Sequence, residues 1–218
     1  MKTLQEIMKD NECDKVQHTY VQGTYERDFV EFRAEKINLL EVGIWMGTSH
    51  QSWIDYFERA LVFGIDIFSR MTPATVPVLK NPRMFWAEGD STDKASVDRC
   101  IDEMEDQVQE TIGGFDVIID DGKHTPEANA RTLTNLWPYL KSGGFYYIED
   151  VWPLNKMTKE ERNNNNWLRS HPEDYNDVSW NNFNEQMLNL PELDNIVEVD
   201  CRKSSGKPDS VIYRLRKV

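Results

Sequence analysis

Short apolar runs alternate with amphipathic segments along most of the chain. The runs that have the length and composition of strands are Ile37–Gly43, Leu61–Ile67, Met84–Ala87, Phe115–Asp120, Gly144–Ile148, Asn195–Asp200 and Ser210–Leu215. Between the first five runs, helical periodicity predicts helices over Ser49–Phe57, Lys94–Glu110 and Pro126–Leu140. Strands that alternate with helices are typical of a parallel sheet with crossover helices. The pattern therefore predicts an α/β fold with a doubly wound, mostly parallel seven-stranded sheet.

The last two predicted strands follow each other without a helical stretch between them. This favours an antiparallel pair at one edge of the sheet. No boundary for a second domain is visible, so residues 1–218 are expected to form one domain, with a helical cap over residues 1–36 and an acceptor-side loop over residues 151–178. In such sheets, ligands bind at the carboxyl ends of the strands, near the point where the strand order reverses.

Composition narrows the classes of partner. The net charge of −13 repels nucleic-acid phosphates, so nucleic acid is not an expected partner. The three cysteines are far apart and form no CxxC pair, which is typical of free thiols in a reducing compartment. No segment has the apolar length of a membrane span or of a signal peptide. We therefore expect a cytoplasmic protein without membrane contact.

The first predicted strand runs into a turn that contains two glycines. The turn resembles a dinucleotide-binding fingerprint, but Trp45 stands where a second glycine would let a pyrophosphate approach the backbone, which argues against NAD. Glu41, Gly43 and Gly47 suit instead a ligand with an amino acid moiety, whose carboxylate the helix amino terminus at Ser49 would favour. A glycine-rich turn without any ligand is the alternative.

Two further acids end the second and third predicted strands. Asp66 is placed to accept hydrogen bonds from a ribose diol, and Asp90 to face an adenine amino group. The alternatives are a solvated strand-end carboxylate for Asp66 and a helix cap for Asp90. Because three successive strand ends agree, we favour a nucleoside ligand that has no phosphates.

The fourth and fifth strand ends carry a cluster of acids. Asp120 and Asp121 end one strand with His124 close behind, and Glu149 and Asp150 end the next. If these strands are neighbours, the carboxylates converge and repel one another unless a cation lies between them. Oxygen ligands without thiolate favour a hard ion such as Mg²⁺. The alternatives are solvated loop carboxylates and, for His124, a surface or helix-capping histidine.

Together these features resemble the S-adenosylmethionine site of class I methyltransferases. The segments IIDDGKH and LWPYLKSGGFYYIEDVWP are similar to those of the metal-dependent O-methyltransferases that modify sugars in macrolide antibiotic biosynthesis, and of their cephalosporin-tailoring relatives. Upstream, DKVQHTY and WIDYF also resemble that group's pattern. The likeness extends from about Asp14 to Pro153.

The resemblance implies a reaction and a set of roles. It implies an S-adenosylmethionine-dependent O-methyltransferase that acts on a hydroxyl of a small acceptor, such as a sugar or another vicinal diol, with Mg²⁺ or Mn²⁺ as the metal. The metal would acidify the hydroxyl and a base would remove its proton. The roles that follow are metal binding by Asp121, Glu149 and Asp150; catalysis by His124 as the base together with Asp121; and cofactor binding by Glu41, Gly43, Gly47, Ser49, Asp66, Asp90 and Asp120.

This chain departs from the family pattern in two ways. Lys123 replaces the small residue that is usual between Gly122 and His124. In addition, the extra amino-terminal domain of the macrolide enzymes is not expected here. The identity of the acceptor and the assembly are therefore not inherited from the resemblance.

Some assignments stay open at this stage. Two other classes of function compete: a metal-dependent hydrolase or isomerase on a similar scaffold, and a non-catalytic S-adenosylmethionine-binding module. His18 is either a second polar contact of the site or structural. Of the aromatic residues after the fifth strand, Trp152 best suits an acceptor platform, with packing as its alternative, and Trp180 is expected in a core. Residues 1–33 are expected to fold over the site and to contribute to a homo-oligomer contact.

Overall fold

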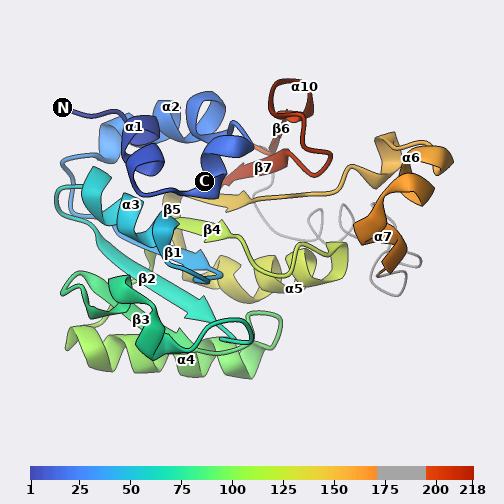
Figure 1. Ribbon diagram of the computed structural model, residues 1–218. Coiled ribbons are helices and arrows are strands. Elements are labelled where there is room, and N and C mark those ends of the chain that lie inside the picture. Colours follow the sequence, from blue (N-terminus) through green and yellow to red (C-terminus); the bar gives the residue numbers. More distant parts are fainter. Residues whose placement is uncertain (171–194) are drawn as a thin grey trace.

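The computed structural model describes residues 1–170 and 195–218, and its centre is a seven-stranded sheet (Figure 1). The strand order is β3-β2-β1-β4-β5-β7-β6. The strands are β1 (Asn38–Val42), β2 (Leu61–Asp66), β3 (Met84–Glu88), β4 (Phe115–Asp120), β5 (Leu140–Ile148), β6 (Val197–Asp200) and β7 (Val211–Arg216). The first five strands are parallel, whereas β7 runs antiparallel to both β5 and β6. The predicted fold class is therefore confirmed, including the antiparallel pair at one edge.

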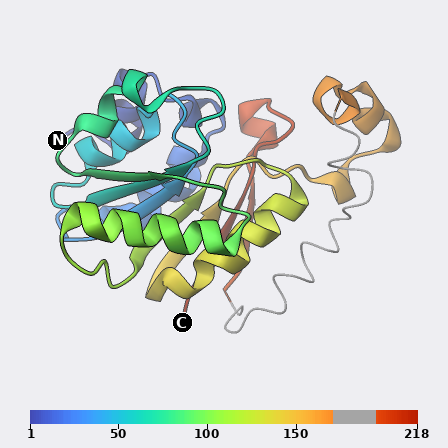
Figure 2. The ribbon, with the colours of Figure 1, turned by 90° about the horizontal axis from the view of Figure 1, so that it is seen from below.

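Helices cover both faces of the sheet. Figure 1 shows α1 (Leu4–Asp10), α2 (Glu26–Phe29) and α3 (Thr48–Tyr56) above it and α4 (Lys94–Val108) and α5 (Pro126–Leu136) below it. Figure 2, seen from below, shows the green α4 and the yellow α5 side by side across that lower face. Each face buries its own apolar core.

Periodic apolar positions explain the packing of α4. Val97, Cys100, Ile101 and Met104 are buried and recur three or four residues apart, so one stripe of the helix faces the sheet. The helix begins at the side-chain cap Asp93, which accepts from the Ala95 amide. Sequence pattern and burial agree here, which is why this helix was predicted within two residues of its ends.

The predicted helix over Pro126–Leu140 is wrong at its carboxyl end. The α-helix ends at Leu136, a short 3₁₀ turn (Trp137–Tyr139) follows, and β5 already begins at Leu140. Pro138 explains the stop, because it has no N–H with which to continue the helix. The Ser142–Gly144 stretch lies inside β5, where the register with β4 shifts between Phe115 and Val117.

Between β6 and β7 the structure also differs from the prediction. A four-residue helix, α10 (Arg202–Ser205), connects these strands where no helical stretch was expected. It ends at Gly206, whose φ of 72° lies in the left-handed region that glycine tolerates. This turn is too short for helical periodicity to be visible in the sequence.

The first 36 residues are a series of short helical turns. Besides α1 and α2 they contain η1 (Asp14–Gln17), η2 (Val21–Tyr25) and η3 (Val30–Phe32). Thr3 and Glu6 form a capping box that starts α1. Tyr20, Tyr25 and Phe29 are fully buried in the core of the upper face, next to α3 and β5. This segment therefore packs on the sheet close to the carboxyl ends of its central strands.

After β5 the described chain continues through η7 (Leu154–Lys156), α6 (Lys159–Asn164) and α7 (Asn166–Ser170). Trp152 is only 6% exposed and packs with Leu154, Met157 and Leu168, which favours the packing alternative for its ring. The rest of the predicted acceptor-side loop, with Trp180, lies outside the described residues. Within the described part of the chain, no helix combines the length and the apolar character that crossing a membrane requires.

Candidate active site

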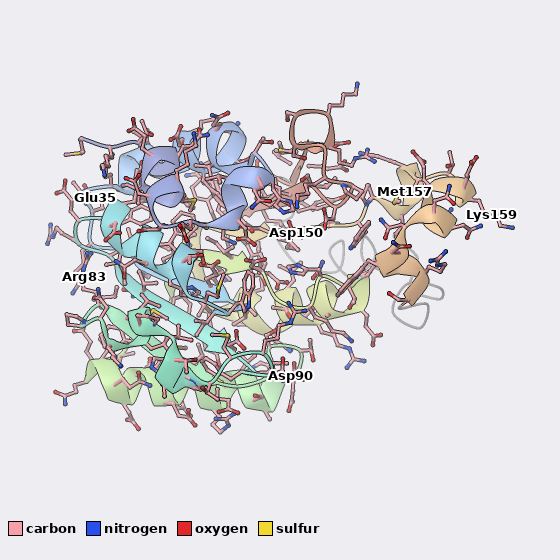
Figure 3. All side chains as sticks on the ribbon, viewed as in Figure 1. Glu35, Arg83, Asp90, Asp150, Met157 and Lys159 are labelled. Carbon is pink, nitrogen blue, oxygen red and sulfur yellow. The ribbon has the colours of Figure 1, made fainter. Side chains whose placement is uncertain are left out.

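Parallel strands bring the predicted acids to one edge of the sheet. Figure 3 shows Asp90 and Asp150 along this edge, with Arg83 and Glu35 at the opposite one. The strand ladder extends one step beyond β4 and β5, because the Asp121 amide donates to the Val42 carbonyl oxygen of β1 and the Glu149 amide donates to the Asp120 carbonyl oxygen of β4. The edge lies where the strand order reverses between β1 and β4, the usual place for a ligand in such sheets.

A buried lysine lies at the centre of the acids. Lys15 is 2% exposed, and its Nζ donates 2.6 Å hydrogen bonds to Asp121 Oδ2 and Glu149 Oε2. The same Nζ is 3.0 Å from Glu41 Oε1. These carboxylates end three adjacent strands, β1, β4 and β5. We call Glu41, Asp121, Glu149 and Asp150 the acid cluster.

Two tyrosines of the amino-terminal segment donate to the same cluster. The Tyr25 hydroxyl donates to Glu149 Oε1 in a buried contact. The Tyr20 hydroxyl donates a 2.6 Å hydrogen bond to Asp150 Oδ1 and accepts one of 2.9 Å from the Asp150 amide. His18 Nδ1 lies 3.2 Å from the same Asp150 oxygen and 2.9 Å from Ser210 Oγ, so His18 is a polar contact of the site.

Sequence reasoning gave no roles to Lys15, Tyr20 and Tyr25. All three lie in or near the DKVQHTY segment, which was noted only for its resemblance. Lys15 and Glu149 are 134 positions apart in the chain, so nothing local shows the pairing. The available signal was the polar and aromatic character of a segment predicted to fold over the site.

Burial makes the acids of this edge costly to ionise. Desolvation raises the pKa of Glu149 well above its ordinary value, although the Lys15 ammonium opposes this shift. Burial likewise raises the pKa of Asp150, and that of Asp120 to about 7. The Lys15 ammonium keeps its proton because the three carboxylates raise its pKa despite the burial. An additional cation near these groups would favour their ionised forms.

A second group of ligand atoms lies on the outer side of the cluster. One side-chain ligand atom from each of Asp121, His124 and Asp150 lies within 4.8 Å of the others, and all three residues are partly exposed. Asp121 belongs to both sides, since Oδ2 faces Lys15 while Oδ1 is 3.6 Å from His124 Nε2. The carboxylate oxygens of this group fit a hard divalent ion, and the imidazole lies beside them.

Backbone conformation supports a special role for this outer group. His124 and Asp150 have φ values of 60° and 50°, in the left-handed region that residues other than glycine rarely adopt. Strained backbone of this kind concentrates at functional sites, where the surrounding structure maintains it. Here the Tyr20 hydroxyl, bonded to both the amide and the carboxylate of Asp150, is one such restraint.

Asp66 organises the glycine turn. Its Oδ2 accepts from the amides of Ile44 and Trp45 at 2.6 and 3.0 Å, and its Oδ1 accepts from the Phe68 amide at 2.6 Å. Trp45 has a φ of 44° and an exposed side chain, so these bonds hold an unusual conformation. A carboxylate offers about four acceptor positions, so a ribose hydroxyl remains compatible with Asp66.

The two glycines of this turn are required by the fold itself. At Gly43, with a φ of 88°, a Cβ atom would collide with the Asp121 carbonyl oxygen, and at Gly47, with a φ of 74°, with the Val78 side chain. Gly47 begins α3 without a side-chain cap, so no side chain competes for the helix amino terminus near Ser49. Glycine alone therefore does not identify a ligand here.

The remaining cofactor candidates differ in exposure. Glu41 is fully buried and its Oε2 accepts from the Trp53 indole at 2.6 Å, so it faces the interior next to Lys15. Asp90 is exposed, and its Oδ1 accepts from the amide and hydroxyl of Thr92; Asp93, not Asp90, caps α4. Asp120 is buried, and its Oδ2 has no hydrogen-bond partner among the described residues.

Comparison with known proteins identifies the family of this chain. A family model described as a methyltransferase domain matches residues 40–151, just over half of the chain. The chain belongs to this methyltransferase family. In sequence it is related to the macrolide sugar O-methyltransferases. The comparisons give no support to the hydrolase or isomerase alternative.

Curated relatives of this methyltransferase share about a third of its residues over the matched region. Demethylmacrocin O-methyltransferase of Streptomyces fradiae is 33% identical over 135 residues, which cover 59% of this chain and 31% of the relative. L-olivosyl-oleandolide 3-O-methyltransferase of Streptomyces antibioticus is 36% identical over 143 residues, covering 60% and 33%. The chain thus matches only about a third of the length of these relatives.

Among solved structures, the methyltransferase is similar in fold to MycE of the mycinamycin biosynthetic pathway, solved in complex with Mg, SAH and mycinamycin VI. The TM-score is 0.65 at 22% sequence identity, over 99% of this chain and 54% of MycE. At this identity the likeness establishes the fold of the methyltransferase and nothing more specific.

Proposed function

We propose that this protein is an S-adenosylmethionine-dependent, divalent-metal-assisted O-methyltransferase that acts on a hydroxyl of a small acceptor, a sugar or another vicinal diol. The observation that carries the proposal is the convergence of Asp121, His124 and Asp150 at the strand ends of a methyltransferase-family domain. A site for binding the cofactor alone would not need an acid cluster and a histidine beside it.

In this proposal the metal ligands are Asp121, Glu149 and Asp150. Bound there, Mg²⁺ or Mn²⁺ would lower the pKa of an acceptor hydroxyl and position its oxygen for attack. Both oxygens of Glu149 already accept hydrogen bonds, from Lys15 and Tyr25. Each carboxylate oxygen has a second lone pair, so ligation by Glu149 is compatible with these bonds.

His124 is proposed as the base that removes the hydroxyl proton. Histidine is the side chain most often used as a general base, and His124 lies at the partly exposed side of the cluster, where an acceptor can enter. Asp121 Oδ1, 3.6 Å from Nε2, would stabilise the imidazolium that forms. Asp121 thus serves both the metal and the base.

The cofactor is proposed to lie along the ends of β1, β2 and β3. S-adenosylmethionine supplies the methyl group on its sulfonium. Gly43, Gly47 and Ser49 would face its amino acid part, Asp66 its ribose and Asp90 its adenine. Glu41 and Asp120, both buried, would act from behind the pocket.

The acceptor class is proposed from the relatives. By their names, the curated relatives methylate hydroxyls of macrolide or tetracenomycin sugars. A sugar diol also offers two neighbouring oxygens to a metal. A cytoplasmic location and a homo-oligomer are further parts of the proposal.

The test combines binding and turnover. Calorimetry with S-adenosylhomocysteine, NAD and Mn²⁺ should show binding of the first and last but not of NAD. Methyl transfer from labelled S-adenosylmethionine should then be assayed on deoxysugar glycosides, free sugars and catechols, with and without EDTA. Binding of NAD without any binding of S-adenosylhomocysteine would refute the proposal.

A further inference from the structure

The acid cluster has an inner and an outer side. On the inner side, the Lys15 ammonium contacts three carboxylates and is shielded from solvent. On the outer side, Asp121, His124 and Asp150 are partly exposed. Asp121 connects the two sides through its two oxygens.

An ammonium group has three donors and no acceptor. At Lys15 its three carboxylate neighbours are Glu41, Asp121 and Glu149, at 3.0, 2.6 and 2.6 Å. Two of these contacts are hydrogen bonds, to Asp121 and Glu149, and the third, to Glu41 Oε1, is an ion pair. Asp150, the fourth acid, instead receives the Tyr20 hydroxyl.

We infer that Lys15 is a positioning residue that serves as the built-in inner cation of the acid cluster, so that the lysine neutralises one of the four carboxylates and a single divalent ion on the outer side neutralises two more. The inference rests on the proposed function, because it assumes that a divalent ion binds beside Asp121. Lys15 has two effects in this arrangement. It holds the carboxylates together in the metal-free protein, and it lowers the affinity of the acid cluster for further cations.

Removing the Lys15 ammonium should therefore lower the stability of the metal-free protein and raise its affinity for a divalent ion. Lys15→Met keeps an unbranched apolar stem of similar length and removes only the charge and the donors. The metal-free protein then contains buried carboxylates without their counter-charge, which is strongly destabilising. A divalent ion, however, no longer meets a positive charge across Asp121, so it should bind more tightly. A residue that matters only for packing would not tighten metal binding when it is replaced.

The experiment measures thermal unfolding by circular dichroism in EDTA and in Mn²⁺, and the Mn²⁺ dissociation constant by electron paramagnetic resonance. The proteins are the parent, Lys15→Met and the control Lys141→Met, which breaks a 2.8 Å ion pair with Asp116 at the opposite end of β4. In EDTA, Lys15→Met should unfold at least about 5 °C below the parent. It should gain more from Mn²⁺ than the parent does and bind Mn²⁺ about tenfold more tightly. Lys141→Met should keep the parental Mn²⁺ affinity.

Unchanged or weaker Mn²⁺ binding by folded Lys15→Met would overturn the inference. If Lys15→Met does not fold, the double variant Lys15→Met/Glu41→Gln is used, because it has the same net charge in the cluster as the parent. It should fold and bind Mn²⁺ within about threefold of the parental affinity. If this double variant does not fold either, the inference is wrong. If the parent itself binds no Mn²⁺, the proposed metal-assisted function is wrong. The inner-cation role is then decided in EDTA alone: rescue of Lys15→Met by Glu41→Gln supports it, and no rescue overturns it.

Discussion

The Tyr20 hydroxyl donates a 2.6 Å hydrogen bond to Asp150 Oδ1 and accepts one of 2.9 Å from the Asp150 amide. One phenol therefore restrains both the side chain and the backbone of a proposed metal ligand. Asp150 needs this restraint because its φ of 50° is unfavourable for a residue other than glycine.

Tyr20→Phe should accordingly weaken metal binding more than its single lost hydroxyl suggests. Loss of a group that orients a ligand typically lowers metal affinity by about 10- to 100-fold. Mn²⁺ titration followed by electron paramagnetic resonance measures this. The matched control is Tyr139→Phe, which removes a phenol–carboxylate contact with Asp98 on the lower face of the sheet. Equal Mn²⁺ affinities of the two variants would argue against the role of Tyr20.

Chelation should separate metal binding from cofactor binding. In excess EDTA, methyl transfer should stop while S-adenosylhomocysteine still binds, and Mg²⁺ or Mn²⁺ should restore turnover. Asp121→Asn should lose activity mainly through lower metal affinity, so high Mg²⁺ should recover part of it. Turnover that persists in EDTA would exclude a metal-assisted reaction.

His124→Ala should keep metal and cofactor binding but turn over about 10²- to 10⁴-fold more slowly, the usual contribution of a positioned general base. Part of the rate should return at high pH, where the acceptor hydroxyl ionises unaided. Single-turnover kinetics together with calorimetry distinguish this from a binding defect. A variant as fast as the parent would remove His124 from the mechanism.

Replacement by alanine should affect the stability of the protein at Asp66 but not at Asp90. Asp66→Ala removes three bonds to backbone amides, so both the thermal midpoint and the affinity for S-adenosylhomocysteine should fall, the latter by about 1–3 kcal/mol. Asp90→Ala breaks only local bonds to Thr92, so its midpoint should change little while its affinity falls. Unchanged affinity in both variants would place the cofactor elsewhere.

Asp28 links the amino-terminal segment to the sheet and should give stability that depends on pH. Burial opposes its ionisation, but hydrogen bonds from Arg27, Tyr147 and Arg214 lower its pKa overall. A lowered folded-state pKa contributes stability above the unfolded value of about 4, and this contribution is lost as the pH falls through the folded pKa. Asp28→Asn should therefore be less stable than the parent at pH 7, by about 1–2 kcal/mol. In urea unfolding the difference should shrink towards pH 3, and a constant difference would contradict the prediction.

Several features of this protein follow from the sequence alone. Apart from β5, which begins four residues earlier than predicted, the strands were predicted within two residues of their observed bounds because apolar runs are local signals. The meeting of Asp121 with Asp150 was also predictable, since parallel strands end at one edge of a sheet. Pro138 would have marked the end of α5, had its missing N–H been weighed against the apolar pattern.

Only the tertiary structure decided what balances these acids. In sequence, Lys15 is an ordinary charged residue that one expects at the surface. It is buried because its segment folds over the sheet and brings it to Asp121, 106 positions away in the chain. Tyr20 and Tyr25 likewise find their carboxylates through packing and not through spacing. Local pattern thus placed the acids, while their counter-charge and hydrogen-bond donors come from long-range contacts that no periodicity encodes.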